Sequence, residues 1–178
     1  MTRMADSSRA TNRVKTVVLG LGNSLRADDG VGLYVARAVK RLVESPDIIV
    51  AESSASGLDV LDCLCGFDRA IVLDAVQTGE GKVGDIRRLA APSSGRHMTN
   101  PHSTDLAMAL ELGKQVGLPL PSDIAVFGIE IADSGSFAEQ CTPEVAAAID
   151  RCAKLVLQHA TAPAEKPSNA GHHVSGMA

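Results

Sequence analysis

The stretch Val17–Gly32, which reads VVLGLGNSLRADDGVG, constrains the fold more than any other part of this chain. It begins as a short valine-rich apolar run that includes Gly20 and Gly22. A polar loop with the adjacent acids Asp28 and Asp29 follows, and a helical pattern begins directly behind it. A strand that leads through a tight glycine turn into a helix is typical of α/β folds, where such turns hold ligands or metal ions. We therefore expect a ligand-binding turn that carries two carboxylates.

Short apolar runs alternate with helical patterns along the rest of the chain, and proline or glycine residues mark most boundaries. This alternation predicts an α/β sandwich with a largely parallel sheet. The predicted strands are Lys15–Leu21, Asp47–Ala51, Arg69–Ala75, Lys82–Leu89 and Asp123–Ile131. The predicted helices are Val31–Val43, Leu58–Leu64, Thr104–Val116 with a cap at Ser103 or Thr104, and a last helix that opens at Thr142-Pro143-Glu144.

The length of 178 residues fits a single domain. Aromatic residues make up only 2% of the chain, so its core must consist of Val, Leu, Ile and Ala. The polar start predicts a flexible N-terminal extension over residues 1–14, and the Pro-, Gly- and Ser-rich end predicts a disordered tail over 161–178. The single α/β domain is then expected over residues 15–160.

The formal net charge of −4 gives no electrostatic reason to expect nucleic acid as a partner. No apolar stretch approaches the ~18 residues that a membrane span needs, and the start of the chain lacks the apolar segment of a secretory signal. The four cysteines show no C-x-x-C spacing and are expected to be buried or half-buried thiols. These features predict a cytoplasmic protein.

Three acidic residues are expected at one edge of the sheet. Asp28 and Asp29 follow the first strand, and Asp74 lies at the end of the third. Ligands bind at the carboxyl ends of parallel strands. A structural interpretation remains open for each of these acids. The adjacent aspartates are also typical helix caps, with Asp28 capping the helix and Asp29 pointing outward. Asp74 is also suited to accept hydrogen bonds from backbone amides of the next loop.

His102 completes a candidate metal-binding set with Asp29 and Asp74. It lies at a predicted helix start, where the helix dipole favours the neutral imidazole that binds metals. Two carboxylates and one imidazole suit a borderline divalent cation with open positions for water or substrate. His97 is the rival ligand, and a surface position is the structural alternative for His102. Asn23 is a candidate for orienting the first loop, and Asp28 for supporting the ligands.

Other motifs are missing or incomplete. A dinucleotide fingerprint would need its third glycine at Leu25, and no Gly-Lys-Ser/Thr of a P-loop occurs. The chain also lacks H-E-x-x-H and G-x-S-x-G.

Five segments, in order, make the chain resemble the maturation endopeptidases of nickel–iron hydrogenases. They are VVLGLGNSLRADDGVG (17–32), SASG (54–57), AIVLDAVQTG (70–79), NPHSTDLAMAL (100–110) and AVFGIEIADSGSFAEQCTPEV (125–145). The resemblance implies a three-layer α/β/α sandwich with a twisted, mostly parallel sheet of about five strands. It also places the family's metal-binding positions on Asp29, Asp74 and His102, with an aspartate where relatives often have glutamate.

The resemblance further implies an activity. Family members remove a C-terminal extension from the hydrogenase large subunit once nickel has been inserted, and they recognise the nickel that this precursor carries. The expected partner is therefore a large-subunit precursor, nickel comes with the substrate, and no organic cofactor is expected. A binding module or chaperone that holds the nickel-bearing precursor without cutting it is the alternative hypothesis.

Overall fold

The computed structural model describes residues 13–54, 58–89, 101–132 and 136–163, with the side chains of residues 101–105 excluded. Its sheet has the strand order β2-β1-β3-β5-β4, and only β4 runs antiparallel to its neighbour. Most of the extension predicted over residues 1–14 and of the tail predicted over 161–178 lies outside the described residues. The strands are β1 (Thr16–Leu21), β2 (Ile48–Ser53), β3 (Arg69–Val76), β4 (Ile86–Leu89) and β5 (Asp123–Glu130).

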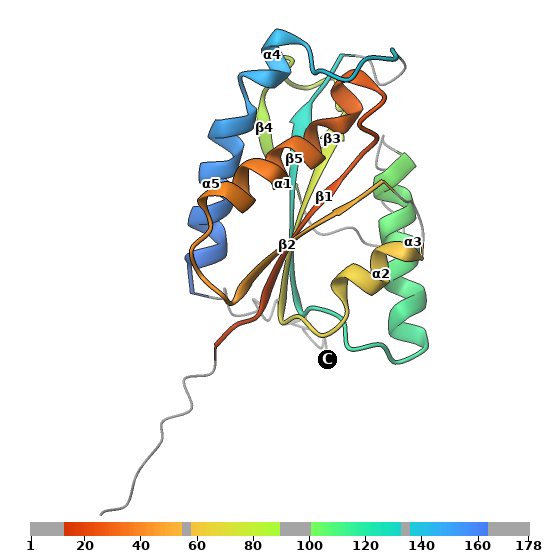
Figure 1. Cartoon of the computed structure of the whole chain (residues 1–178). Coiled ribbons are helices and arrows are strands. Elements are labelled where there is room, and N and C mark those ends of the chain that lie inside the picture. The colour runs from red at the N-terminus through yellow and green to blue at the C-terminus, as the bar shows by residue number, and fades with distance from the viewer. Residues whose placement is uncertain (1–12, 55–57, 90–100, 133–135, 164–178) are drawn as a thin grey trace, which may run out of the picture.

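Helices cover both faces of the sheet, as the resemblance implied (Figure 1). One face is covered by α1 (Val31–Leu42) and α5 (Ile149–Thr161), and the other by α2 (Asp59–Leu64) and α3 (Pro101–Gln115). Two short helices, η1 (Ala27–Gly30) and α4 (Pro143–Ala146), lie in the segments that precede α1 and α5. The expected α/β/α sandwich with a mostly parallel, five-stranded sheet is confirmed.

The apolar residues form two cores, one on each face of the sheet. All side chains of the central strands β1 and β3 are buried, as expected of strands that are covered on both faces. Aliphatic residues supply almost all of this buried surface, and the aromatic contribution comes from the buried Phe127 and the partly buried Phe67. The four cysteines are free thiols that are buried or half-buried, as predicted. Among the described residues, no helix combines the length and the apolar character that crossing a membrane requires.

Three predicted boundaries were wrong. The strand expected from Lys82 begins only at Ile86, because the chain first turns at Gly84 with φ 85°. The last helix is divided into α4 and α5, and at the break the amide of Ala148 bonds to the carbonyl three residues back instead of four. The helix α3 begins at Pro101, so Ser103 and Thr104 lie inside it and not at its cap. Proline suits this position because its missing N–H is not needed in a first helical turn.

Candidate functional site

Close backbone packing brings the turn after β1 to the end of β3. Gly22 has φ 137°, a conformation that favours glycine, and a Cβ on it would overlap the carbonyl oxygen of Asp29. A Cβ on Gly32 would overlap the carbonyl oxygen of Leu73. The first turn of α1 therefore lies directly against β3, at the residue before Asp74. The glycines of the first motif serve this approach of helix to sheet and leave the acids at the sheet edge.

Asp29 lies in η1 and is 3% exposed. Its Oδ2 accepts a hydrogen bond of 3.1 Å from the backbone N–H of Asn23, and Asn23 Oδ1 accepts one of 3.0 Å from the N–H of Leu25. Asn23 therefore holds the loop in shape from both sides, which confirms its expected orienting role. Burial of the Asp29 carboxylate carries a desolvation cost, which the hydrogen bond from Asn23 offsets in part.

Asp28 has a different role from the helix cap that the sequence suggested. No side-chain cap hydrogen bond is present at the start of α1, so the predicted capping of that helix was wrong. Instead, the Asp28 carboxylate accepts hydrogen bonds from the backbone N–H of Thr142 at 2.7 Å and from its hydroxyl at 2.9 Å. Thr142 is the N-cap residue of α4. Asp28 therefore ties the first loop to a segment that lies 114 residues further along the chain.

Asp74 lies within β3 and is 1% exposed. Its neighbours Leu73 and Ala75 belong to the core under α1 and α5, whereas Val72 belongs to the core under α2 and α3 together with Leu106 of α3. Successive side chains of a strand point to opposite faces of the sheet. The carboxylate of Asp74 therefore points to the face that α3 covers.

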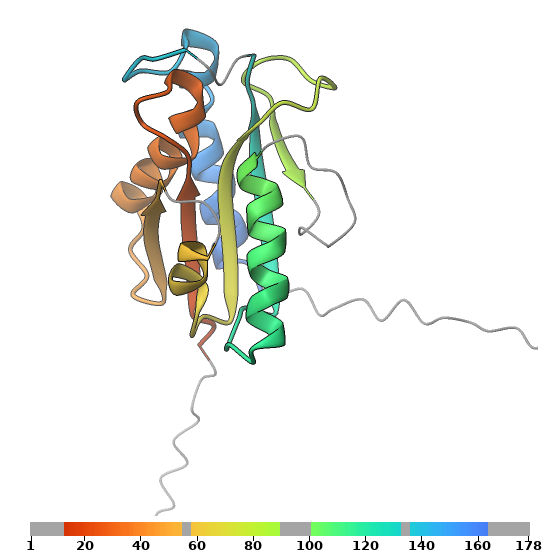
Figure 2. The ribbon, with the colours of Figure 1, turned by 90° about the vertical axis from the view of Figure 1, so that its right-hand side faces the viewer.

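His102 is the second residue of α3. Figure 2 shows this helix antiparallel to β3 and β5, with its first turn toward the carboxyl ends of these strands. The backbone thus brings His102 to the same face as Asp74 and to the same end of the sheet. The side chain of His102, and all of the rival ligand His97, lie outside what the structure describes.

The described side chains include no group of three or more His, Cys, Asp or Glu residues placed to hold a metal ion. This set of side chains includes Asp29 and Asp74 but not His102, so the predicted three-residue set stays a prediction.

Glu130, at the end of β5, is a buried acid that sequence reasoning missed. It is 3% exposed and accepts hydrogen bonds from the N–H groups of Thr78 and Gly79, at 2.8 and 2.9 Å, and from the Thr78 hydroxyl at 2.7 Å. These amides belong to the loop after β3. They are the backbone amides that the sequence offered as structural partners for Asp74. A signal was available, since Glu130 ends an apolar strand just as Asp74 ends the run IVLD.

The segment 136–142 packs against the first loop and α1. The Tyr34 hydroxyl donates a hydrogen bond of 2.6 Å to the carbonyl of Glu139, and burial raises the pKa of Tyr34. Cys141 Sγ lies 3.6 Å from the carbonyl oxygen of Ala27. Burial, and after it the nearby Asp28 carboxylate, raise the pKa of Cys141 to about 11. Cys141 is therefore protonated at neutral pH and is poorly suited to act as a nucleophile.

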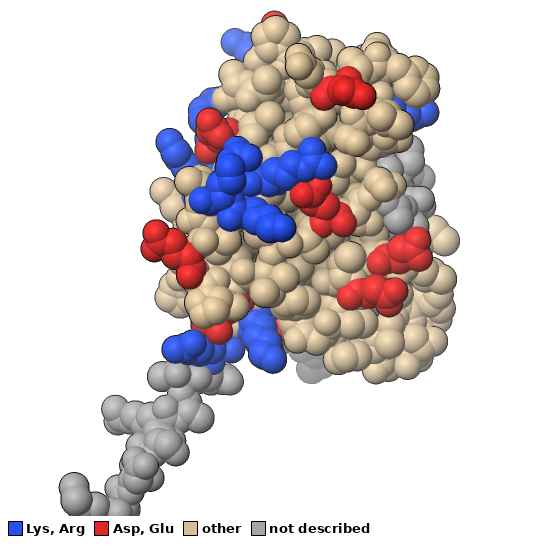
Figure 3. Space-filling view, viewed as in Figure 1, with Lys and Arg blue, Asp and Glu red and all other residues tan. Residues whose placement is uncertain are grey.

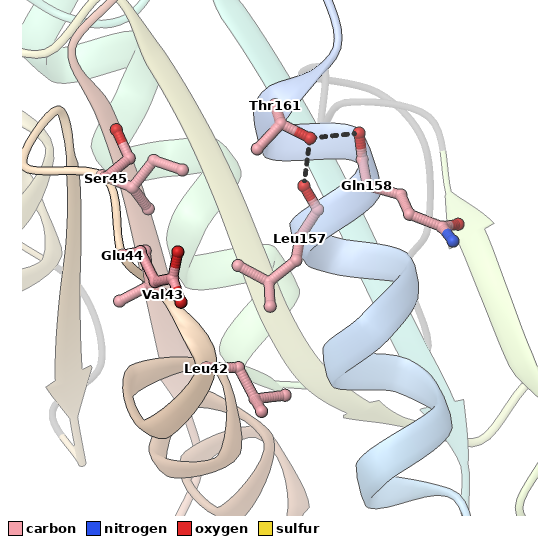
Figure 4. Close-up of a pocket in the computed structure, with 8 residues that line it drawn as sticks. Leu42, Val43, Glu44, Ser45, Leu157, Gln158 and Thr161 are labelled. Atoms are coloured by element: carbon pink, nitrogen blue, oxygen red, sulfur yellow. Dashed lines mark hydrogen bonds between the residues drawn. The ribbon is translucent and has the colours of Figure 1, made fainter.

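A groove of about 410 Å³ lies at the opposite end of the sheet. It is formed where α1 ends, β2 begins and α5 ends, and Leu42, Ser45 and Leu157 are among the residues that line it (Figure 4). None of the candidate ligands contributes to this groove, so it is separate from the site at the carboxyl ends of the strands.

Comparisons with known proteins point to one family. The family model for hydrogenase maturation proteases matches residues 33–159, a segment that includes Asp74 and His102 and begins after Asp29. The hydrogenase 2 maturation protease of Escherichia coli K12 is 25% identical over 148 residues, which cover 81% of this chain and 89% of that protein. The hydrogenase expression/formation protein HupD of Bradyrhizobium diazoefficiens is 27% identical over 143 residues, which cover 78% of this chain and 73% of that protein.

Solved structures with a similar fold carry related names. The hydrogenase maturating endopeptidase HybD of E. coli has a TM-score of 0.71 at 23% identity and aligns over 82% of this chain and 91% of its own. The [NiFe] hydrogenase maturation protease HycI of Thermococcus kodakarensis KOD1 has a TM-score of 0.60 at 25% identity, over 83% of this chain and 93% of its own.

Proposed function

The chain belongs to the hydrogenase maturation protease family, and from this premise we propose that it is the endopeptidase that removes the C-terminal extension of a nickel–iron hydrogenase large subunit. The precursor of that subunit is its partner, and cleavage follows the insertion of nickel. The nickel belongs to the substrate and reports that the precursor is ready to be cut. The proposed reaction requires no organic cofactor.

One observation supports this proposal above others: two buried carboxylates come from different elements to the same end of the sheet. Asp29 follows β1, and Asp74 lies in β3 on the face that α3 covers. Buried acids of this kind are costly unless a cation or a hydrogen-bonding partner compensates them. We assign Asp29, Asp74 and His102 as the residues that contact the nickel of the precursor.

This donor set suits the proposed task. Two oxygen ligands and an imidazole leave positions open on a divalent ion, so the ion can keep the ligands of its own protein while it contacts this one. Such a contact holds the neighbouring polypeptide in one orientation, which favours attack on a single peptide bond. A cation at this place also polarises a carbonyl group or lowers the pKa of a bound water molecule.

We further propose that the protein acts in the cytoplasm. All four of its cysteines are free thiols, which is typical of a reducing compartment.

The decisive experiment incubates the protein with purified large-subunit precursor in nickel-loaded and nickel-free forms. Mass spectrometry of the precursor then detects loss of the C-terminal segment. We expect the unsubstituted protein to cut only the nickel-loaded form, and we expect Asp74→Asn and His102→Ala to leave it intact. Glu111→Gln is the matched control, because it removes an exposed charge from the helix that carries His102.

Each possible result has a clear meaning. Full cutting by Asp74→Asn and His102→Ala would refute the assigned metal contacts. Equal cutting of both precursor forms would refute recognition of nickel. Tight binding of the nickel-loaded precursor by the unsubstituted protein, with no change in the mass of the precursor, would instead identify a binding module or chaperone.

A further inference from the structure

Two large apolar side chains lie in solvent next to the candidate site. Leu25 is 58% exposed and Phe137 is 81% exposed, and the latter is the most exposed large apolar residue in the described part of the chain. Both residues belong to the loops at the carboxyl end of the sheet, which lie together in Figures 1 and 2. Exposed apolar side chains beside a site supply surface that a partner can cover.

A β-bridge joins the two loops that carry this pair of residues, which we call the apolar rim (Leu25 and Phe137). The residues that follow them, Arg26 and Ala138, form a parallel β-bridge, and the N–H of Ala27 donates a hydrogen bond of 2.7 Å to the carbonyl of Ala138. Leu25 and Phe137 are the residues directly before the two bridged residues. The bridge and this hydrogen bond therefore fix the backbone next to both residues, which lowers the conformational entropy that is lost when a partner covers them.

The apolar rim is continuous with the candidate site. The N–H of Leu25 donates to the side chain of Asn23, and the N–H of Asn23 donates to the carboxylate of Asp29. On the other strand of the bridge, Phe137 belongs to the segment that Asp28 ties down through Thr142. A group that covers the apolar rim is thereby placed beside Asp29.

Charge does not explain the binding surface at this end of the molecule. Figure 3 shows Lys and Arg gathered over α1, whereas the charged side chains at the upper end of the visible face are scattered and of both signs. The exposed charged residues Arg26 and Glu139 flank Leu25 and Phe137 in the chain, and the contact that Leu25 and Phe137 themselves offer is apolar. For an endopeptidase, the matching group is an apolar side chain of the polypeptide that it cuts.

We propose that Leu25 and Phe137 position the substrate polypeptide by packing against an apolar side chain next to the bond that is cut. The inference rests on the proposed function and extends it, since it names a contact with the chain of the precursor in addition to the contact with its nickel. Both residues are positioning residues. They hold the polypeptide near Asp29 and take no part in the chemical step.

The test replaces each residue with serine and measures two quantities. The first is the cleavage rate of nickel-loaded precursor over a range of precursor concentrations. The second is the Kd for the same precursor in an Asp74→Asn background, where the precursor is expected to stay whole. Val116→Ser is the matched control, because Val116 is 64% exposed and follows the C-terminal end of α3, away from the apolar rim.

We expect Leu25→Ser and Phe137→Ser each to raise KM and Kd by about tenfold, with kcat within about twofold of the unsubstituted protein. Val116→Ser should change none of these quantities. Because Leu25 and Phe137 are exposed, both variants should melt at the temperature of the unsubstituted protein. If Phe137→Ser does melt lower, Phe137→Leu keeps an apolar group there and should restore KM.

Normal KM and normal Kd in the double variant Leu25→Ser/Phe137→Ser would overturn the apolar rim and leave the proposed protease function intact. A fall in kcat with unchanged KM and Kd would also overturn it. If the unsubstituted protein binds the precursor without cutting it and the double variant loses this binding, the apolar rim is supported and the proposed protease function fails.

Discussion

The substitution Gly32→Ala sets two physical effects against each other. Gly32 is the second residue of α1, where alanine has a higher intrinsic helix propensity than glycine, by up to about 1 kcal/mol. The local sequence alone therefore predicts that the substitution stabilises the protein. The tertiary structure predicts the opposite, because the new Cβ would overlap the carbonyl oxygens of Leu21 and Leu73.

The size of the steric effect decides whether Gly32→Ala stabilises or destabilises the protein. An extra methyl group in a packed core costs about 1–3 kcal/mol where side chains give way. At Gly32 the opposing atoms are backbone oxygens of the two central strands β1 and β3, so the cost lies at or above the upper end of that range. After subtraction of the helix gain, we expect the free energy of unfolding to fall by about 2–3 kcal/mol. In a domain of this size, such a loss lowers Tm by about 4–12 °C.

Thermal and urea denaturation of the purified protein measure this effect. The matched control is Gly113→Ala in α3, another buried helical glycine, for which the atoms nearest to an added Cβ are methyl groups of Leu120, Leu61 and Leu118. These side chains can shift, so the control should stay within about 1 kcal/mol of the unsubstituted protein. An unchanged or higher Tm for Gly32→Ala would refute the argument that this glycine sets the distance between helix and sheet.

Four further predictions concern Asp28, Cys141 and Arg69. Asp28→Asn should lower the free energy of unfolding in urea by about 1–2 kcal/mol, because the amide replaces a charged acceptor of the Thr142 hydrogen bonds. An unchanged midpoint of urea unfolding would contradict a stabilising role for the hydrogen bonds between Asp28 and Thr142. The same variant should lower the pKa of Cys141 from about 11 while burial keeps it above 9.0, so peptide-resolved alkylation of this thiol at pH 9 should accelerate. Folding raises the pKa of Cys141, so the contribution of the protonated thiol to stability is complete below pH 9 and is lost as pH rises toward 11. The substitution Cys141→Ala should therefore weaken the decline in Tm between pH 9 and pH 11. An unaltered decline would count against the raised pKa of Cys141. Arg69→Met should cost about 3 kcal/mol in urea, because the buried guanidinium pairs with Asp123 and donates to carbonyls at the end of α5, and a loss below about 1 kcal/mol would contradict this role.

Several parts of the fold could be predicted from the sequence because they leave a local pattern. The runs at β1, β3 and β5 are mostly apolar, as is typical of strands that are covered on both faces, and their predicted bounds lie within two residues of the observed ones. The ends of strands and helices were less predictable where the apolar pattern is weaker. The residues before Ile86 alternate like a strand, but Gly84 turns the chain there, and nothing in the sequence marks the break between α4 and α5.

The candidate site divides in the same way. Its location at the carboxyl ends of the strands follows from the order of strands and helices, so Asp29 and Asp74 could be assigned to one end of the sheet in advance. The hydrogen-bond partners of the buried acids could not be predicted from the sequence. Asp28 has the appearance of a helix cap in the sequence, yet its carboxylate bonds to Thr142, and Glu130 was overlooked although it holds the loop after β3.

The sequence by itself therefore determined the alternation of strands and helices, the glycine turn and the end of the sheet at which the acids gather. These features depend on periodicity and on residues that are neighbours in the chain. Only the tertiary structure decided which acid ties two segments together, which face of the sheet Asp74 points to, and that Arg26 pairs with Ala138. The physical reason is that hydrogen bonds and close packing between distant segments depend on how the layers pack, and no local pattern records that packing.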